Sequence, residues 1–487
     1  MKTDDNGTMS VMSPSMPQAN EIMAKATMAA AVFNQLDQAH VDRIVEAVYK
    51  AGFNARVRLA KMAAEETGLG VWQHKVLKNV LGTQLVYESI RNEKTVGILS
   101  HDERSGITEI AQPLGPIFAI IPVTNPTSTA MFKILISLKT RNPIIISPAR
   151  RALKCCAEAA RISYEAALRA DAPEDCIQWL AESSRDLTQA IMGHPKLALI
   201  LATGGGGLVK AAYSSGTPAI GVGPGNVPVF IDRSADFAYA VRSIVASKTF
   251  DNGTICASEQ AVIVEQACAD AVVRAFEAQQ CYFLPPEDIK KIEAIAVDTE
   301  SGTMNPKIVG QPVEKIARMA GIAVPAGTCI LMARQDQVGR RYPLSGEILA
   351  PILAFYVRPD YESACKLCID LNYLGGVGHT ASIYANDGRR IQAFAEMMNA
   401  GRVVVNTPSS QGAVGGTYNA LPVSFTLGCG SGGKNITTEN ITARHLINVK
   451  RLCRPHRNER WFAFDAAKFM DESLDADAVA GAYNLNF

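Results

Sequence analysis

Residues 248–260 read KTFDNGTICASEQ. Within this stretch, Cys256 follows a loop that contains Gly253 and precedes the apolar run Ala261–Val264, which is typical of a buried strand. A thiol at such a junction can be exposed, and neighbouring backbone N–H groups can stabilise a thiolate or an oxyanion. A buried structural cysteine is the ordinary alternative for any single cysteine. Motifs elsewhere in the chain distinguish a reactive thiol from a structural cysteine.

Composition describes an ordinary globular protein. The chain has 487 residues, of which 48% are hydrophobic and 20% charged, and its net charge is +1. This length predicts two or three lobes, and the balanced charge does not favour nucleic acid or an acidic membrane as a partner. No apolar run reaches the roughly 18 residues of a membrane helix, and no secretory signal is visible at the N-terminus. We therefore expect a cytoplasmic protein.

Cysteine usage supports the same compartment. The eleven cysteines are odd in number and lack a repeated spacing, which favours reduced thiols over a disulfide framework. Cys365 and Cys368 have the spacing of metal ligands, but neither a second pair nor a histidine lies nearby. We interpret them as two cysteines on one helix face and predict no metal site.

Alternating strands and helices dominate the chain. Helical periodicity covers 20–66 and 74–90, and a short alternating strand is expected at 108–112. Further helices are expected at 128–139, 149–171 and 208–215. Apolar runs typical of doubly buried parallel strands occur at 117–123, 143–147, 197–203 and 227–232. Strands at 261–265 and 352–357, with helices at 267–279 and 361–372, predict a second lobe of the same kind. This alternation predicts an α/β fold with two doubly wound, Rossmann-like lobes.

Domain boundaries follow from these elements. We expect a flexible polar arm at 1–19, a first lobe at 20–245 and a second lobe with Cys256 at 246–427. The glycine-rich segment at 428–453 is expected to return to the first lobe. A tail with a charged linker occupies 454–487.

Several motifs resemble one family. The Cys256 segment, TNPTST at 124–129 and GHTA at 378–381 are similar to those of the aldehyde dehydrogenase superfamily, specifically its CoA-acylating branch. KAAYSSG at 210–216 and NTPSSQG at 406–412 resemble the same branch. The resemblance runs from about Ala24 to about Arg451. It implies a dinucleotide-binding first lobe, a catalytic second lobe, an oligomerisation hairpin with a strand near 105–113, and a homodimer or homotetramer.

The resemblance also implies roles for individual residues. Cys256 matches the catalytic nucleophile, and Asn125 matches the asparagine that forms the oxyanion hole together with the cysteine N–H. Glu347, in SGEILAP, resembles the glutamate that holds the nicotinamide ribose. His379 is either a base or CoA contact, or a structural hydrogen-bonding residue.

The expected cofactor is NAD or NADP, although no G-x-G-x-x-G motif is present. Four glycines follow Thr203 between a buried strand and a helix, where backbone can approach a nucleotide closely. The resemblance places these residues around the cofactor: Thr124, Ser147, Pro148, Thr203, Gly204, Gly205 and Gly223. Arg150 and Arg151 suit a 2′-phosphate, the phosphates of CoA or a solvated helix start, so NAD and NADP both stay open.

A position without a carboxylate indicates which nucleophile releases the acyl group from the cysteine. Hydrolytic aldehyde dehydrogenases carry a glutamate that activates water, and Val222 stands at the matching position here. A thiol needs less activation than water, so the resemblance implies release of the acyl group by coenzyme A. Short aldehydes are the expected substrates. The alternatives are an anionic aldehyde, such as sulfoacetaldehyde or succinic semialdehyde, and a hydrolytic enzyme that releases a free acid.

The tail leaves two interpretations open. Trp461, Phe462, Phe464, Phe469, Met470 and Leu474 line part of a predicted short amphipathic helix. This helix either packs on its own domain or docks onto a partner subunit or a protein shell, as in a bacterial microcompartment. A catalytically silent subunit that docks through this tail is the alternative from a different class, and the intact Cys256 segment argues against it.

Overall fold

The computed structural model describes residues 15–298, 303–463 and 465–480. These residues form two compact units. Unit 1 comprises Met1–Glu93 and Pro113–Ile447, and unit 2 comprises Lys94–Gln112 and Asn448–Phe487. The predicted arm at 1–19 lies mostly outside the described residues, but helix α1 (Met16–Phe33) already begins within it, so its last four residues were wrongly predicted.

A five-stranded parallel sheet forms the first lobe of unit 1, in the order β5-β4-β3-β6-β7. Its strands are β3 (Ile117–Ile121), β4 (Ile144–Pro148), β5 (Ile177–Trp179), β6 (Leu199–Thr203) and β7 (Ala219–Val222). Helices α1, α8 (Arg185–Met192) and α9 (Gly206–Tyr213) share a buried apolar cluster with one face. Helices α6 (Pro126–Lys139) and α7 (Leu153–Arg169) pack on β3, β4 and β5. Helices on both faces explain why these strands are apolar throughout.

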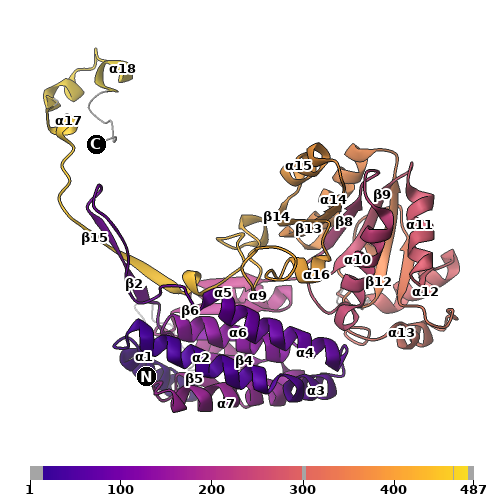
Figure 1. Cartoon of the computed structure of the whole chain (residues 1–487), viewed down its shortest axis with the longest axis horizontal. Coiled ribbons are helices and arrows are strands. Elements are labelled where there is room, and N and C mark those ends of the chain that lie inside the picture. Colours follow the sequence, from indigo (N-terminus) through magenta and orange to yellow (C-terminus); the bar gives the residue numbers. More distant parts are fainter. Residues whose placement is uncertain (1–14, 299–302, 464, 481–487) are drawn as a thin grey trace, which may run out of the picture. The chain divides into compact units, whose positions relative to one another are not determined.

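A layer of helices adds to this lobe (Figure 1). It contains α2 (Gln38–Asn54), α3 (Arg56–Thr67), α4 (Trp72–Val80), the π-helical turn η1 (Leu81–Leu85) and α5 (Val86–Ile90). The Asp37 side chain caps α2 by accepting the N–H of His40, and Gly68 ends α3 in a left-handed conformation. Gly82 lies against the backbone of Ser128, where an added Cβ would be 2.6 Å from the carbonyl oxygen. This close approach ties η1 to α6, the helix that follows Asn125.

A seven-stranded parallel sheet forms the second lobe, in the order β10-β11-β12-β9-β8-β13-β14. Its strands are β8 (Val227–Ile231), β9 (Glu259–Glu265), β10 (Cys281–Phe283), β11 (Ile330–Arg334), β12 (Ile352–Arg358), β13 (Gly378–Tyr384) and β14 (Ala400–Val405). Helices α10 (Phe237–Thr249) and α11 (Ala269–Ala278) share one apolar cluster with the sheet. Helices α14 (Tyr361–Gly375) and α15 (Gly388–Met397) share another, and α12 (Pro286–Ala296) and α13 (Val313–Ala320) a third.

The predicted boundary between the lobes at residue 245 was wrong. Strand β8 pairs with β9 and β13, so the chain enters the second sheet at Val227. Helix α10 packs on α11 in that lobe. An apolar run in the sequence does not indicate which sheet the strand will join, because the pairing and register of a strand depend on strands that are distant in the sequence. The predicted helix at 208–215 likewise begins earlier, at Gly206.

Unit 2 contains a three-stranded sheet in the order β1-β2-β15. Its strands are β1 (Gly97–Asp102), β2 (Ile107–Pro113) and β15 (Ile447–Cys453), and β1 pairs with β2 in antiparallel orientation. The expected strand near 105–113 is therefore present, and its role in oligomerisation stays a prediction. In its described residues, which exclude Phe464, the tail forms three short helices rather than the single helix predicted: α17 (Glu459–Ala463), η7 (Ala466–Met470) and α18 (Ala476–Val479).

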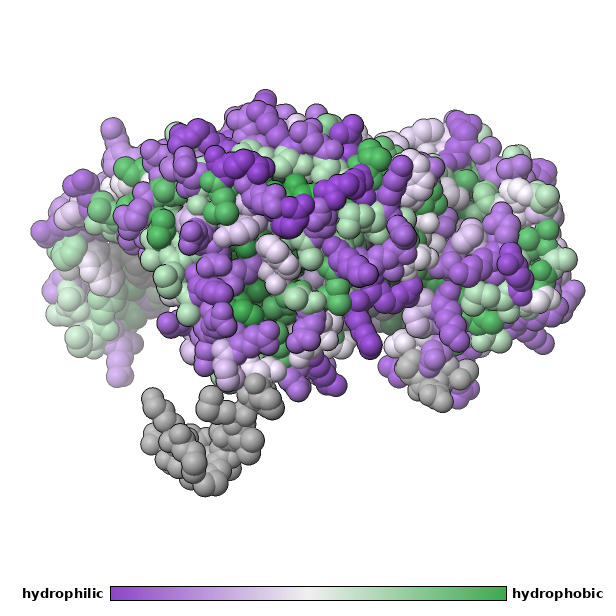
Figure 2. All heavy atoms as spheres, turned by 90° about the horizontal axis from the view of Figure 1, so that it is seen from below, coloured by the Kyte–Doolittle hydropathy of each residue, from purple (hydrophilic) through white to green (hydrophobic). Residues whose placement is uncertain are grey.

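The described surface is mixed in character. Polar and apolar residues are interspersed over the face drawn in Figure 2. Within the described residues, no helix combines the length and apolar character needed to cross a bilayer.

Candidate active site

A cavity of about 440 Å³ in unit 1 opens at the carboxyl ends of the first sheet. Residues after β3, β4, β6 and β7 line it, together with residues that follow α10 in the second lobe. The chain leaves β3 toward β4 on one side, whereas β6 lies on the other side, so this edge is a topological switch point. Crevices at such points are where doubly wound sheets bind ligands.

Most of the residues singled out in the sequence meet in this cavity. Its lining includes Cys256, Asn125, Thr124, Ser147, Pro148, Thr203, Gly204, Gly205, Gly223 and Glu347. His379 is absent from the lining. Residues that sequence reasoning missed also line the cavity, among them Ser183, Thr188, Met304, Val309 and Leu349. The missed residues carry no motif, and their side chains reach the cavity only because the two lobes fold around it.

Cys256 is partly exposed and lies in the loop between α10 and β9. The loop begins with Asp251 and Asn252, which have φ values of 51° and 53°, in the left-handed region that few non-glycine residues adopt. Burial, followed by the charges of Glu347 and Cys429, raises the pKa of the Cys256 thiol to about 12, although Arg402 opposes this shift. The structure therefore holds a protonated thiol at neutral pH in the absence of ligands.

Asn125 immediately precedes α6, whose first residue is Pro126. Its backbone carbonyl accepts the N–H of Thr129, and its side-chain Nδ2 donates to Thr124 Oγ1 at 3.2 Å. Its Oδ1 accepts from Lys78 Nζ at 2.6 Å. The amide oxygen is therefore held by the protein, whereas one of the two Nδ2 N–H bonds is left for a group in the cavity.

Glu347 enters the cavity from the segment between the 3-10 turn η4 (Pro343–Ser345) and β12. Its Oε1 accepts the backbone N–H of Gly225 at 3.0 Å. Burial raises its pKa to about 7, against the opposing effects of the Gly225 hydrogen bond and Lys248. Among the described residues that line the cavity, Glu347 is the single carboxylate, and lysine and arginine are absent.

The part of the cavity lined by residues between β6 and α9 suits a dinucleotide. Helix α9 begins at Gly206 with Gly205 as its N-cap, so its free N–H groups lie beside the lining residues Gly204 and Gly205. A Cβ added at Gly205 would meet nothing within 4 Å, which leaves room for a ligand against the backbone. Thr203 Oγ1 is buried there without a protein partner. These groups fit a pyrophosphate and a ribose hydroxyl.

Val222 lies in the same lining at the end of β7. This is the position at which hydrolytic relatives were expected to carry the glutamate that activates water. Its side chain is apolar and 2% exposed, so it supplies neither a proton acceptor nor a hydrogen bond to a water molecule.

His379 is the second residue of β13 and is not among the residues that line the cavity. A Cβ on Gly225 would lie 3.0 Å from the His379 ring and 2.4 Å from the carbonyl oxygen of Cys256, so both pack around this glycine. The ring Nδ1 pairs with Thr380 Oγ1 at 3.0 Å. Burial, followed by Arg402, lowers the His379 pKa to about 3. A base this weak favours the structural alternative of the two sequence interpretations.

The two arginines after Ala149 differ in their surroundings. Arg151 Nη2 donates to the carbonyl oxygen of Thr67. Arg150 begins the 3-10 turn η2 (Arg150–Ala152) and is exposed next to the lining residue Ala149. Arg150 is thus the better placed of the two to meet a cofactor phosphate.

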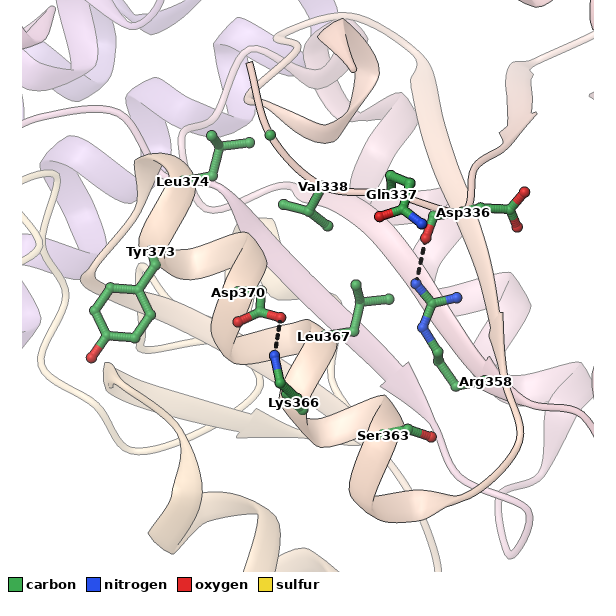
Figure 3. Close-up of a pocket in the computed structure, with 11 residues that line it drawn as sticks. Asp336, Gln337, Val338, Arg358, Ser363, Lys366, Leu367, Asp370, Tyr373 and Leu374 are labelled. Carbon is green, nitrogen blue, oxygen red and sulfur yellow. Dashed lines mark hydrogen bonds and ion pairs between the residues drawn. The ribbon is translucent and has the colours of Figure 1, made fainter. Parts of the chain in front are cut away.

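A second cavity of about 520 Å³ lies between α14 and residues 336–339 (Figure 3). Three of its charged groups are engaged with the protein: Lys366 pairs with Asp370 at 2.7 Å, and Arg358 Nη2 donates to the carbonyl oxygen of Asp336 at 2.7 Å. Its lining contains no cysteine or histidine. We therefore place the candidate active site in the Cys256 cavity, although the other cavity is larger.

The cysteine pair Cys365 and Cys368 is buried in the apolar cluster under α14. Within the part of the chain that the structure describes, no three His, Cys, Asp or Glu side chains are grouped to hold a metal ion.

Comparison with known proteins places this geometry in context. A model of the aldehyde dehydrogenase family matches residues 3–419. The chain is 45% identical over 448 residues to the bifunctional aldehyde-alcohol dehydrogenase AdhE of Escherichia coli (strain K12). The matched region covers 91% of this chain and 50% of that relative. The chain thus spans about half the length of this curated relative.

Two solved structures are similar over nearly their full length. An acetylating aldehyde dehydrogenase from Geobacillus thermoglucosidasius superposes with a TM-score of 0.89 at 46% identity, covering 93% of this chain and 99% of that one. A propionaldehyde dehydrogenase from Rhodopseudomonas palustris, solved with bound CoA and an acylated cysteine, gives a TM-score of 0.79 at 26% identity. It covers 90% of this chain and 97% of that chain.

Proposed function

Since the chain belongs to the aldehyde dehydrogenase family, we propose that it is a CoA-acylating member. It oxidises a short aldehyde with NAD or NADP and transfers the acyl group to coenzyme A, in either direction. The observation that carries this proposal is a single cavity that holds Cys256, Asn125 and Glu347 and has Val222 in place of a carboxylate.

The first half-reaction forms a thioester. The Cys256 thiol loses its proton to solvent as its sulfur attacks the aldehyde carbon, and Asn125 Nδ2 and the Cys256 backbone N–H donate to the oxygen as it becomes negative. When bound, the nicotinamide supplies the acceptor for the hydride that leaves this carbon. Glu347 and the N-terminus of α9, which both lie at the cavity, would hold the cofactor.

The second half-reaction releases the acyl group. The CoA sulfur bonds to the acyl carbon as the bond from that carbon to the Cys256 sulfur breaks, and the proton that the CoA thiol loses restores the Cys256 thiol. This exchange of one thioester for another requires no base for water, and Val222 provides none. A hydrolytic enzyme needs a carboxylate that activates water. Among the described lining residues the one carboxylate is Glu347, whose Oε1 accepts the Gly225 N–H and which is assigned to the ribose.

The cavity also bears on the substrate. A carboxylate or sulfonate on the aldehyde needs a cationic partner, and the described lining contains neither lysine nor arginine. This favours a short neutral aldehyde over succinic semialdehyde or sulfoacetaldehyde.

The proposal is tested by an aldehyde panel assayed for NADH or NADPH formation with and without CoA. We expect turnover to need CoA, and Cys256→Ala to abolish it. Equal rates without CoA would favour the hydrolytic alternative. Retained turnover in Cys256→Ala would remove the nucleophile assignment.

We further propose that the protein acts as a homodimer or homotetramer in the cytoplasm and that its tail docks onto a partner. The exposed apolar side chains of the tail support docking: Trp461, Phe462 and Phe469 are 48%, 59% and 43% exposed, and Met470 is 84% exposed. Trp461 stacks on Phe469, with ring centroids 5.5 Å apart, which gives the tail a local apolar surface. A protein shell or a second subunit are the candidate partners.

A further inference from the structure

A cluster of three charged side chains is buried behind the candidate oxyanion hole. Lys75 and Lys78 of α4 are 2% and 1% exposed, and Asp251 of the thiol loop is 0% exposed. The Lys75 and Lys78 ammonium groups lie 2.9 and 2.5 Å from the same oxygen, Asp251 Oδ2. Two cations and one anion leave a net positive charge in a place where water is excluded. We call these three residues the Lys–Asp cluster.

Lys78 makes three hydrogen bonds at once. Its Nζ lies 2.5 Å from Asp251 Oδ2, 2.6 Å from Asn125 Oδ1 and 2.8 Å from Thr254 Oγ1. Thr254 donates its own hydroxyl proton to Asp251 Oδ2 at 2.8 Å, so its oxygen can accept from Lys78. An ammonium has three N–H donors and no acceptor, so the three partners match its full capacity.

This arrangement dictates how the Asn125 amide is turned. A donor-only ammonium can meet the amide oxygen but not the amide NH₂, so Oδ1 must face Lys78. The Nδ2 group then points the other way. One of its two N–H bonds goes to Thr124 Oγ1 at 3.2 Å, and the second is left for an oxygen in the cavity that Asn125 and Cys256 both line.

We infer that Lys78 is a positioning residue of the reaction: it locks Asn125 in the orientation that donates to the oxyanion. The remainder of the Lys–Asp cluster keeps this ammonium in place and adds net positive charge behind the developing negative oxygen. This inference rests on the proposed function, because it assigns a role relative to the thioester chemistry at Cys256.

The charge states support this role. Burial lowers the pKa of Lys78 to about 8, while Asp251 opposes that shift, so the ammonium form still predominates at pH 7. Lys78 and Lys75 hold the pKa of Asp251 below its usual value despite burial. Asp251 also accepts the N–H of Val71 at 2.7 Å, which joins the start of α4 to the thiol loop. These contacts give the cluster a structural role as well. A test of the positioning role must distinguish it from loss of fold stability.

A double-mutant cycle provides that separation. Lys78→Met, Asn125→Ala and the double variant are compared for CoA-dependent aldehyde oxidation. Loss of one oxyanion donor typically costs about 10²- to 10³-fold in kcat, and we expect each single variant to lose about 100-fold. Because Lys78 acts through Asn125, we expect the double variant to be within about threefold of the slower single variant. A double variant slower by the product of the two effects, about 10⁴-fold, overturns the inference.

Controls keep the outcomes distinct. Lys139→Met removes another buried ammonium, which pairs with Asp42 at 2.6 Å away from the cavity, and should leave kcat within twofold. If Lys78→Met fails to fold, Lys78→Arg replaces it, and any loss it causes should likewise disappear in the Asn125→Ala background. An Asn125→Ala variant with full activity would instead refute the proposed oxyanion hole.

Discussion

The Cys256 thiol lies in surroundings that disfavour its ionisation. Its pKa is raised to about 12, chiefly by burial, and the neighbouring Glu347 adds to the shift. Reactivity toward electrophiles follows the thiolate fraction. Below the pKa that fraction rises about tenfold for each pH unit, so ionisation is favoured only as the pH approaches the raised value.

We therefore expect alkylation of Cys256 by iodoacetamide, in the protein without cofactor, to accelerate steadily from pH 7 to pH 10. Mass spectrometry of the Cys256 peptide measures the rate without interference from the exposed Cys453. A plateau near pH 8 would show a thiol with an ordinary pKa and contradict the expectation. Cys256→Ala should leave labelling of Cys453 unchanged.

In the Lys–Asp cluster, residue type and helical position give a wrong prediction of burial. Lys75 and Lys78 look like surface residues of an amphipathic helix, yet they are buried, while Leu77 between them is 52% exposed. The signal in the sequence is the polar stripe of Lys75, Lys78 and Asn79 at three- and four-residue spacing. A helical wheel displays this stripe but does not say which side faces the core.

At the scale of elements, strand ends are held by buried carboxylates. Asp232 and Glu265 follow β8 and end β9, and both are 0% exposed. Arg390 of α15 bridges them, with Nε 2.5 Å from Asp232 Oδ2 and Nη2 2.9 Å from Glu265 Oε2. These two ion pairs join α15 to β8 and β9. The two strands lie on opposite sides of residue 245, where the sequence had wrongly predicted the lobe boundary.

Arg390→Met should lower the free energy of unfolding of the second lobe by about 2 kcal/mol, because removing one partner leaves a buried carboxylate uncompensated. Arg233 still pairs with Glu265, which limits the loss. Urea denaturation measures the effect. Lys366→Met, from an exposed pair with Asp370, is the matched control and should change stability by less than about 0.5 kcal/mol. Equal midpoints for both variants would contradict this account.

At the scale of the molecule, the candidate active site and the tail belong to different units. Every residue that lines the Cys256 cavity belongs to unit 1, whereas the three tail helices belong to unit 2. The exposed apolar side chains of the tail have no counterpart in the proposed reaction. Their expected role is therefore association.

Deleting residues 455–487 should leave kcat/KM within about twofold, because no cavity residue is removed. It should abolish co-purification of the partner or change the sedimentation of the protein. Substituting Trp461 and Phe462 with serine in the full chain provides a milder version of the same test. A large loss of activity together with unchanged association would contradict the docking role.

The sequence by itself determined the α/β class, the residues that match the family and half of the twelve strands in the two sheets, namely β3, β4, β6, β8, β9 and β12. Local periodicity and short motifs carry that information, because burial on two faces requires continuous apolar runs and chemistry requires particular side chains. Only the tertiary structure decided that β8 belongs to the second sheet, that the motif residues meet at one switch point, and that Lys78 contacts Asn125. Those contacts join residues far apart in the chain, and their partners follow from strand pairing and packing rather than from local pattern.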